Sequence, residues 1–225
     1  MKAFSAPAAL PATLLMLAAG LSIAQDASPS VIRWKYGAPN AVIELRNAVK
    51  VEGLKTDDLH VYAALYDIRD TVYNRAWVQI VNLSKAPISF NPQSAVLKDG
   101  RVMHAEAPDK AADSIQKVGE AKSQELSSAH CAMKATLGTG SSMACEPTEA
   151  QMRMSKEVLA TSDSVAQWIR KKALAETTLA PGEEAIGAIV FRKDKRPADY
   201  TLSIPVGSQT FEFPVRALNK PPSYD

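Results

Sequence analysis

The side chains best suited to bind a metal are methionines and histidines that gather between residues 103 and 154. Every methionine after residue 24 lies in this stretch, and two histidines accompany them. Thioether and imidazole ligands select copper, and Cu(I) above all. One hypothesis is therefore a copper site in an exported protein. The methionines are Met103, Met133, Met143, Met152 and Met154, and the candidate ligands are Met103, His104, His130 and Met133.

Helix packing offers a simpler explanation for the same methionines. Methionine is a good helix former and fills irregular gaps in a core, so a helical segment collects it. Met152 and Met154 are two positions apart, which points them in different directions on a helix. An exposed methionine group would also make an adaptable surface for a protein partner. We favour packing or a partner surface over a metal site, and we assign no cofactor.

Matches to enzyme motifs are weak. Residues 114–117 (Ser-Ile-Gln-Lys) have the Ser-x-x-Lys form of penicillin-recognising enzymes, but the companion Ser-Asp-Asn and Lys-Thr-Gly motifs are absent. The chain also has no Gly-x-Ser-x-Gly, His-Glu-x-x-His, P-loop or dinucleotide fingerprint. Its three histidines, His60, His104 and His130, are scattered, so a hydrolase would need a nucleophile and a histidine to converge in the fold. We predict a non-enzymatic protein, with copper binding as the first alternative and an unrecognised hydrolase as the second.

The two cysteines, Cys131 and Cys145, are expected to form a disulfide. In an oxidising compartment, closing a loop of about 15 residues stabilises a fold by roughly 3 kcal/mol in the chain-entropy model. A metal or redox pair would need closer spacing or more ligands nearby. The structural bond is the better interpretation.

The first 24 residues have the form of a secretion signal. Lys2 precedes an uncharged stretch whose apolar centre is residues 14–21, and Ser22-Ile23-Ala24 has the small-x-small form of a cleavage site. This stretch is short for a membrane span and contains Pro11, although a retained N-terminal anchor is the rival interpretation. We therefore expect a periplasmic or secreted protein, with no transmembrane segment after cleavage.

Charge balance excludes some partners. The chain has 26 Lys and Arg and 24 Asp and Glu, and cleavage would remove Lys2. A nearly neutral chain has no bulk attraction for nucleic acid or anionic lipid. The length suits one large domain, or one domain with an insertion.

The elements that must position these residues change type twice along the chain. Residues 31–100 read as short strands and turns, with runs at 60–66 and 75–82 that are apolar on both faces, as expected in a two-layer structure. Residues 105–178 have a helical period, with a possible break at 161–164 where Ser, Thr and Asp compete for backbone hydrogen bonds. The apolar stripe of this segment is Ala111, Ile115, Val118, Leu126, Ala129, Met154, Val158, Val165, Ile169 and Ala173.

Strand alternation returns near the C-terminus. Residues 200–206 and 210–216 alternate strictly between apolar and polar positions around a turn at 207–209. Pro205 and Pro214 cannot donate ladder hydrogen bonds, so we expect this hairpin to lie at a sheet edge or to begin to leave the sheet. The strands before and after the helical segment must pair to complete the sheets.

Three stretches of turn and strand sequence resemble immunoglobulin-like sandwiches of secreted bacterial proteins, several of them families of unknown function. The stretches are residues 81–92 (Val-Asn-Leu-Ser, then Pro87, then Phe-Asn-Pro), residues 179–191 (Leu-x-Pro-Gly-Glu, then Gly187, then Phe191), and residues 211–214 (Phe-Glu-Phe-Pro). The resemblance covers about half of the chain after the signal. It implies an extracellular binding or interaction module, and it carries over no functional residue.

Together these features predict a mainly β fold with a helical insertion (α+β), namely an Ig-like antiparallel β-sandwich with an inserted helical hairpin. The expected organisation is a signal peptide (1–24), N-terminal strands (25–104), the helical insertion (105–178), C-terminal strands (179–217) and a disordered tail (218–225). The expected function is to bind another envelope or extracellular protein through the insertion or an open sheet edge.

Overall fold

The computed structural model describes residues 30–46, 49–68, 71–136, 147–193 and 199–216, without the side chains of residues 49 and 129–136. The predicted signal peptide, the C-terminal tail and Cys145 lie outside the described residues. Over these ranges the chain forms β1 (Ser30–Arg33), β2 (Ala41–Arg46), β3 (Val49–Lys55), β4 (Leu59–Asp67), β5 (Tyr73–Asn82), β6 (Ile88–Phe90), a 3₁₀ turn (Pro92–Ser94), β7 (Val96–Lys98), β8 (Val102–Glu106), α1 (Pro108–Thr136), α2 (Glu149–Lys172), β9 (Thr177–Leu179), β10 (Glu184–Arg192), β11 (Asp199–Val206) and β12 (Gln209–Arg216).

The strands form one large sheet and one small one. The described residues give a ten-stranded sheet in the order β1-β12-β11-β7-β8-β10-β5-β4-β3-β2 and a two-stranded sheet of β6 and β9. One of the two longest pairings joins strands from either side of the helices, since β10 is antiparallel to β5 along its whole length. The predicted mainly β, α+β class is confirmed. Among the described strands the expected antiparallel pairing holds for every pair except β1 and β12, which run parallel.

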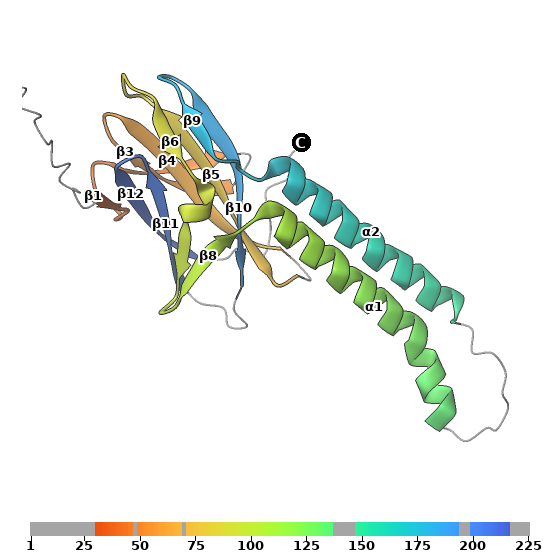
Figure 1. The fold of residues 1–225 in the computed structure, drawn as a ribbon. Helices are drawn as coiled ribbons and strands as arrows, with labels where there is room; N and C mark the ends of the chain where they lie inside the picture. The colour runs from red at the N-terminus through yellow and green to blue at the C-terminus, as the bar shows by residue number, and fades with distance from the viewer. Residues whose placement is uncertain (1–29, 47–48, 69–70, 137–146, 194–198, 217–225) are drawn as a thin grey trace, which may run out of the picture.

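The sheet folds over on itself, so that its two ends share one core (Figure 1). Alternate residues of β4 point inward and meet alternate residues of β11 and β12, as the period of two in a strand requires. Fully burying one such aromatic or aliphatic side chain stabilises a fold by about 1.5–3 kcal/mol. The central members of this core include Val61, Leu65, Leu202, Ile204, Phe211 and Phe213.

The C-terminal hairpin lies inside the sheet rather than at its edge, so that prediction is wrong. β11 borders β7 and β12 borders β1. Both prolines occupy non-hydrogen-bonded positions of the two-residue hairpin, where a backbone N–H would point away from the partner strand. The neighbouring strands stop before reaching them, because β7 pairs only with residues 201–203 and β1 only with residues 209–212. Pro205 and Pro214 therefore leave no ladder bond unmade.

Both helices project from the sheet as an antiparallel hairpin (Figure 1). Thr148 caps α2, accepting a hydrogen bond from the Gln151 N–H while the Gln151 side chain accepts from Thr148. The predicted break at 161–164 is wrong, because α2 is continuous. Asp163 contacts α1 instead of its own backbone, accepting a hydrogen bond from Gln116 at 2.9 Å. No helix among the described residues is long and apolar enough to cross a membrane.

Candidate functional site: a groove on the helical hairpin

The base of the hairpin is anchored on the outer face of the sheet. Ala111, Ala112, Ile115, Ala166 and Ile169 of the two helices are buried against Ile68, Tyr73 and Val190 of the sheet. The Arg75 guanidinium of β5 lies 4.3 Å from the ring centre of Trp168 on α2, a cation–π contact. The proximal part of the hairpin is therefore held in a fixed position relative to the sheet.

Small side chains set a close spacing between the helices. At Gly119 an added Cβ would lie 2.2 Å from Ser162 Oγ, so only glycine fits there without movement of the neighbour. Further out, the hydroxyls of Ser123 and Ser155 hydrogen-bond to each other across the interface. This polar, small-residue seam brings the two helices together without using their larger apolar side chains.

One face of the hairpin is joined by polar contacts. Arg170 of α2 donates to Asp113 at 2.6 Å and to Gln116 at 3.0 Å on α1. Gln116 in turn donates to Asp163. These exposed groups satisfy one another and need no further partner.

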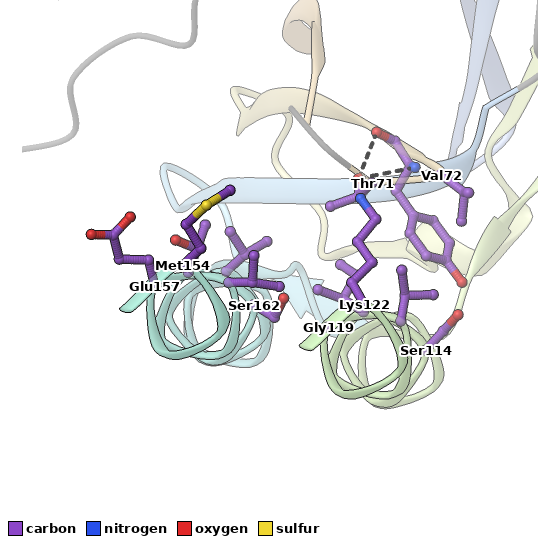
Figure 2. A pocket seen from close by; sticks show the side chains of 14 residues that line it. Thr71, Val72, Ser114, Gly119, Lys122, Met154, Glu157 and Ser162 are labelled. Atoms are coloured by element: carbon purple, nitrogen blue, oxygen red, sulfur yellow. Dashed lines mark hydrogen bonds between the residues drawn. The ribbon is translucent and has the colours of Figure 1, made fainter. Parts of the chain in front are cut away.

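The opposite face carries an apolar groove of about 360 Å³ between α1 and α2 (Figure 2). Its floor includes Ile115 and Val118 from α1, and Val158 and Val165 from α2. Residues 71–73, at the start of β5, close its proximal end. Hydroxyls of the lining, such as those of Thr161 and Ser162, add hydrogen-bonding groups to a mainly apolar surface.

The groove continues a surface that the sheet covers only in part. Near the base, Ile115 is buried under the sheet, whereas one turn further along Val118 is 37% exposed. Met154, on the other helix, is 49% exposed at the distal end of the groove. An apolar stripe at helical spacing usually faces a packed neighbour. Here that stripe extends beyond the sheet that covers its first part.

Opposite charges flank the groove. Figure 2 shows Lys122 rising from α1 and Glu157 at the outer side of α2. The contacts Gly119–Ser162 and Ser123–Ser155 bracket them, so both charges lie at nearly the same level of the hairpin. Neither has an ion-pair partner in the described part of the chain. A ligand in the groove would therefore meet a cation on one side and an anion on the other.

The four candidate copper ligands are not brought together. Met103 and His104 lie on β8, where consecutive side chains point to opposite faces: Met103 packs on the sheet core and His104 is exposed. His130 and Met133 follow on α1, which at 1.5 Å per residue places His130 roughly 30 Å along the axis from Pro108. A helix of this length separates the two pairs, so they cannot share one ion. Within the described ranges, no group of three or more His, Cys, Asp or Glu forms a potential metal site.

The remaining candidates have separate locations. Ser114 lines the groove, but His130 is roughly 24 Å further along the same helix and His60 is on β4. The structure thus brings neither of them to Ser114. The Cys131 side chain and Cys145 lie outside the description, so their disulfide stays a prediction.

Sequence periodicity identified the apolar stripe but not the groove. Ile115, Val118, Met154, Val158 and Val165 all belong to the predicted stripe, and all five line the groove. What the sequence did not show is which of these residues the sheet covers. The contribution of residues 71–73 was also missed, because they lie in a strand region distant in sequence from the helices.

Comparisons of the chain with protein-family models, with curated proteins and with solved structures find no match.

Proposed function

We propose that this chain is an exported, non-enzymatic binding protein whose helical hairpin receives an amphipathic helix of another envelope or extracellular protein. The observation that carries the proposal is the apolar groove between α1 and α2, uncovered beyond the end of the sheet and flanked by Lys122 and Glu157. A helix in a groove is one of the recurring modes of peptide recognition.

The lining suits binding more than chemistry. Its apolar side chains are aliphatic apart from Met154 and Tyr73, and its acid–base groups are Lys122, Glu157 and Tyr73 at the closed end. A third helix laid on two others buries its apolar residues at positions i, i+3, i+4 and i+7. It would thus complete a three-helix packing that the sheet begins at the base.

The charges at the sides define the chemistry of the expected partner. A partner helix should carry an acidic residue on the side that faces Lys122 and a basic residue on the side that faces Glu157. Such pairs at the rim of an interface set orientation more than affinity. The fixed base of the hairpin keeps the groove formed before the partner arrives.

The proposal includes an exported location and a non-enzymatic role. The N-terminal signal pattern supports a periplasmic or secreted location, and the resemblance to secreted Ig-like sandwiches supports an interaction module. An open sheet edge was the other surface expected to bind, and β2 forms one end of the sheet.

A displayed library of helical peptides selected on the mature protein tests the proposal. Binders should share one apolar stripe with an acid on one flank and a base on the other, and they should lose affinity for Val118→Lys. Val102→Lys is the matched control, because Val102 is 57% exposed on β8, away from the groove. Binders that are indifferent to Val118→Lys, or a selection that yields none, would refute the groove as a helix site.

A further inference from the structure

The most exposed apolar side chain of the groove, among the lining residues that the structure describes, belongs to Met154. It is 49% exposed, compared with 41% for Val72 and 37% for Val118. Figure 2 shows the Met154 side chain rising from α2, with its sulfur atom clear of the helix backbone. An oxidant dissolved in water can therefore reach this sulfur when no partner is bound.

Met154 continues the apolar stripe of α2 toward the distal end of the hairpin. It lies four residues before Val158, seven before Thr161 and eleven before Val165, and all of these line the groove. Residues at such intervals share one face of a helix. A partner helix laid along this stripe would therefore cover the thioether of Met154.

Met152 provides a matched comparison on the same helix. It is 43% exposed, nearly as much as Met154, but it is not among the residues that line the groove. Two residues along an α-helix turn the side chain by about 200°, so the two methionines point to different sides of α2. An oxidant can reach both sulfur atoms, whereas a helix in the groove would cover only that of Met154.

We propose that Met154 is an oxidation site that regulates helix binding, an inference that rests on the proposed function of the groove. The oxidant is hydrogen peroxide. The sulfur attacks one peroxide oxygen, so that an S–O bond forms while the O–O bond breaks. The departing hydroxide takes the proton of the transferred hydroxyl and leaves as water. The sulfur loses two electrons and becomes a sulfoxide, and the peroxide gains them.

The sulfoxide alters the groove at the place where a partner would bury it. Oxidation converts a flexible apolar side chain into a polar one and disrupts interfaces that contain methionine. A buried sulfoxide oxygen needs a hydrogen-bond donor, and the apolar stripe of a partner helix supplies none. Oxidation of Met154 should therefore raise the dissociation constant of the helix at least about fivefold. Methionine sulfoxide reductases reverse the change, which suits it to regulation.

Peptide titrations of matched leucine variants test the proposal. The probe is one helical peptide without methionine or cysteine, selected on the unoxidised mature protein, and peroxide is removed before each titration. Leucine replaces methionine with little change in volume and has no sulfur, so Met154→Leu should bind within about twofold of the wild type, before and after peroxide treatment. The wild type and Met152→Leu should both lose affinity at least about fivefold after treatment.

Peptide mapping by mass spectrometry verifies the sulfoxide at each position. A wild type that carries the Met154 sulfoxide and binds as tightly as before would overturn the proposal. A treated Met154→Leu protein that loses as much affinity as the treated wild type would overturn it too. A selection that yields no helical binder would instead refute the helix site, and this proposal with it, so the two failures are distinguishable.

Protection from peroxide tests the same contact in the opposite direction. Saturating peptide should slow the oxidation of Met154 at least about fivefold, because oxidation requires an exposed sulfur. Met152 should oxidise at the same rate with and without peptide. Equal oxidation rates of Met154 in the bound and the unbound protein would show that the helix does not cover it, and would overturn the proposal.

Discussion

Replacing Gly119 by alanine sets two physical effects against each other. Alanine is a better helix former than glycine by about 1 kcal/mol, so propensity alone predicts a more stable protein. The new methyl group, however, would lie 2.2 Å from Ser162 Oγ and 2.5 Å from Ser162 Cβ. The hydroxyl can rotate away, but the Cβ moves only with the backbone of α2. Overpacking of this kind costs about 1–3 kcal/mol, so we expect a net destabilisation of about 1 kcal/mol.

The matched double variant isolates the contact. In the double variant, Ser162→Gly removes the side chain that Gly119→Ala would contact. Its free energy of unfolding should be at least about 1 kcal/mol higher than the value obtained by adding the effects of the two single substitutions to the wild type. Urea unfolding followed by circular dichroism measures all four proteins. A Gly119→Ala protein that is about 1 kcal/mol more stable than the wild type, as propensity alone requires, would refute the close helix spacing.

Three further predictions concern the sheet and the hairpin. Asn82 is fully buried, and its side-chain amide donates to the backbone carbonyls of Ala86 and Leu179. Asn82→Ala should therefore lower the free energy of unfolding, measured by urea titration, by about 1–3 kcal/mol. A change near zero would contradict the bridging role of Asn82 between these two segments. Burial raises the pKa of Glu52, so its ionisation opposes folding and the stability of the wild type should fall as pH rises through that raised pKa. Glu52→Gln should melt at a higher temperature than the wild type at pH 7, and this difference should shrink on acidification. A difference in melting temperature that stays constant or grows on acidification would contradict the raised pKa. Thr148→Ala removes the α2 cap and should cost about 1 kcal/mol, seen as faster hydrogen exchange in the first turn of α2, and unchanged exchange there would contradict it.

The sequence predicted where helices and strands lie in the chain better than it predicted which elements pack beside them. Alternation located the two C-terminal strands, and periodicity located both helices, because each pattern depends on local spacing alone. The prolines at 205 and 214 were misread as edge markers, since their tolerance depends on how far β1 and β7 extend beside them. In the same way, residues 161–164 were predicted to break the helix, but Asp163 finds a hydrogen-bond partner on α1.

The candidate site was predictable only as a surface. The apolar stripe that includes Val118 and Val158 was visible in the sequence, and so was an adaptable methionine surface, of which Met154 lines the groove. That the sheet covers the stripe near Ile115 and stops before Val118 is a property of tertiary packing. The copper hypothesis required distant residues to meet, and the length of α1 keeps them apart.

The most direct test of the groove as a binding site is a calorimetric titration of one selected amphipathic helix against three proteins. These are the wild type, Val118→Lys and Val102→Lys. We expect Val118→Lys to raise the dissociation constant at least about tenfold, which is a loss of about 1.4 kcal/mol of binding free energy. Val102→Lys should leave the dissociation constant within about twofold of the wild-type value. Equal affinity for all three proteins would show that the helix binds elsewhere, and the central claim would be wrong.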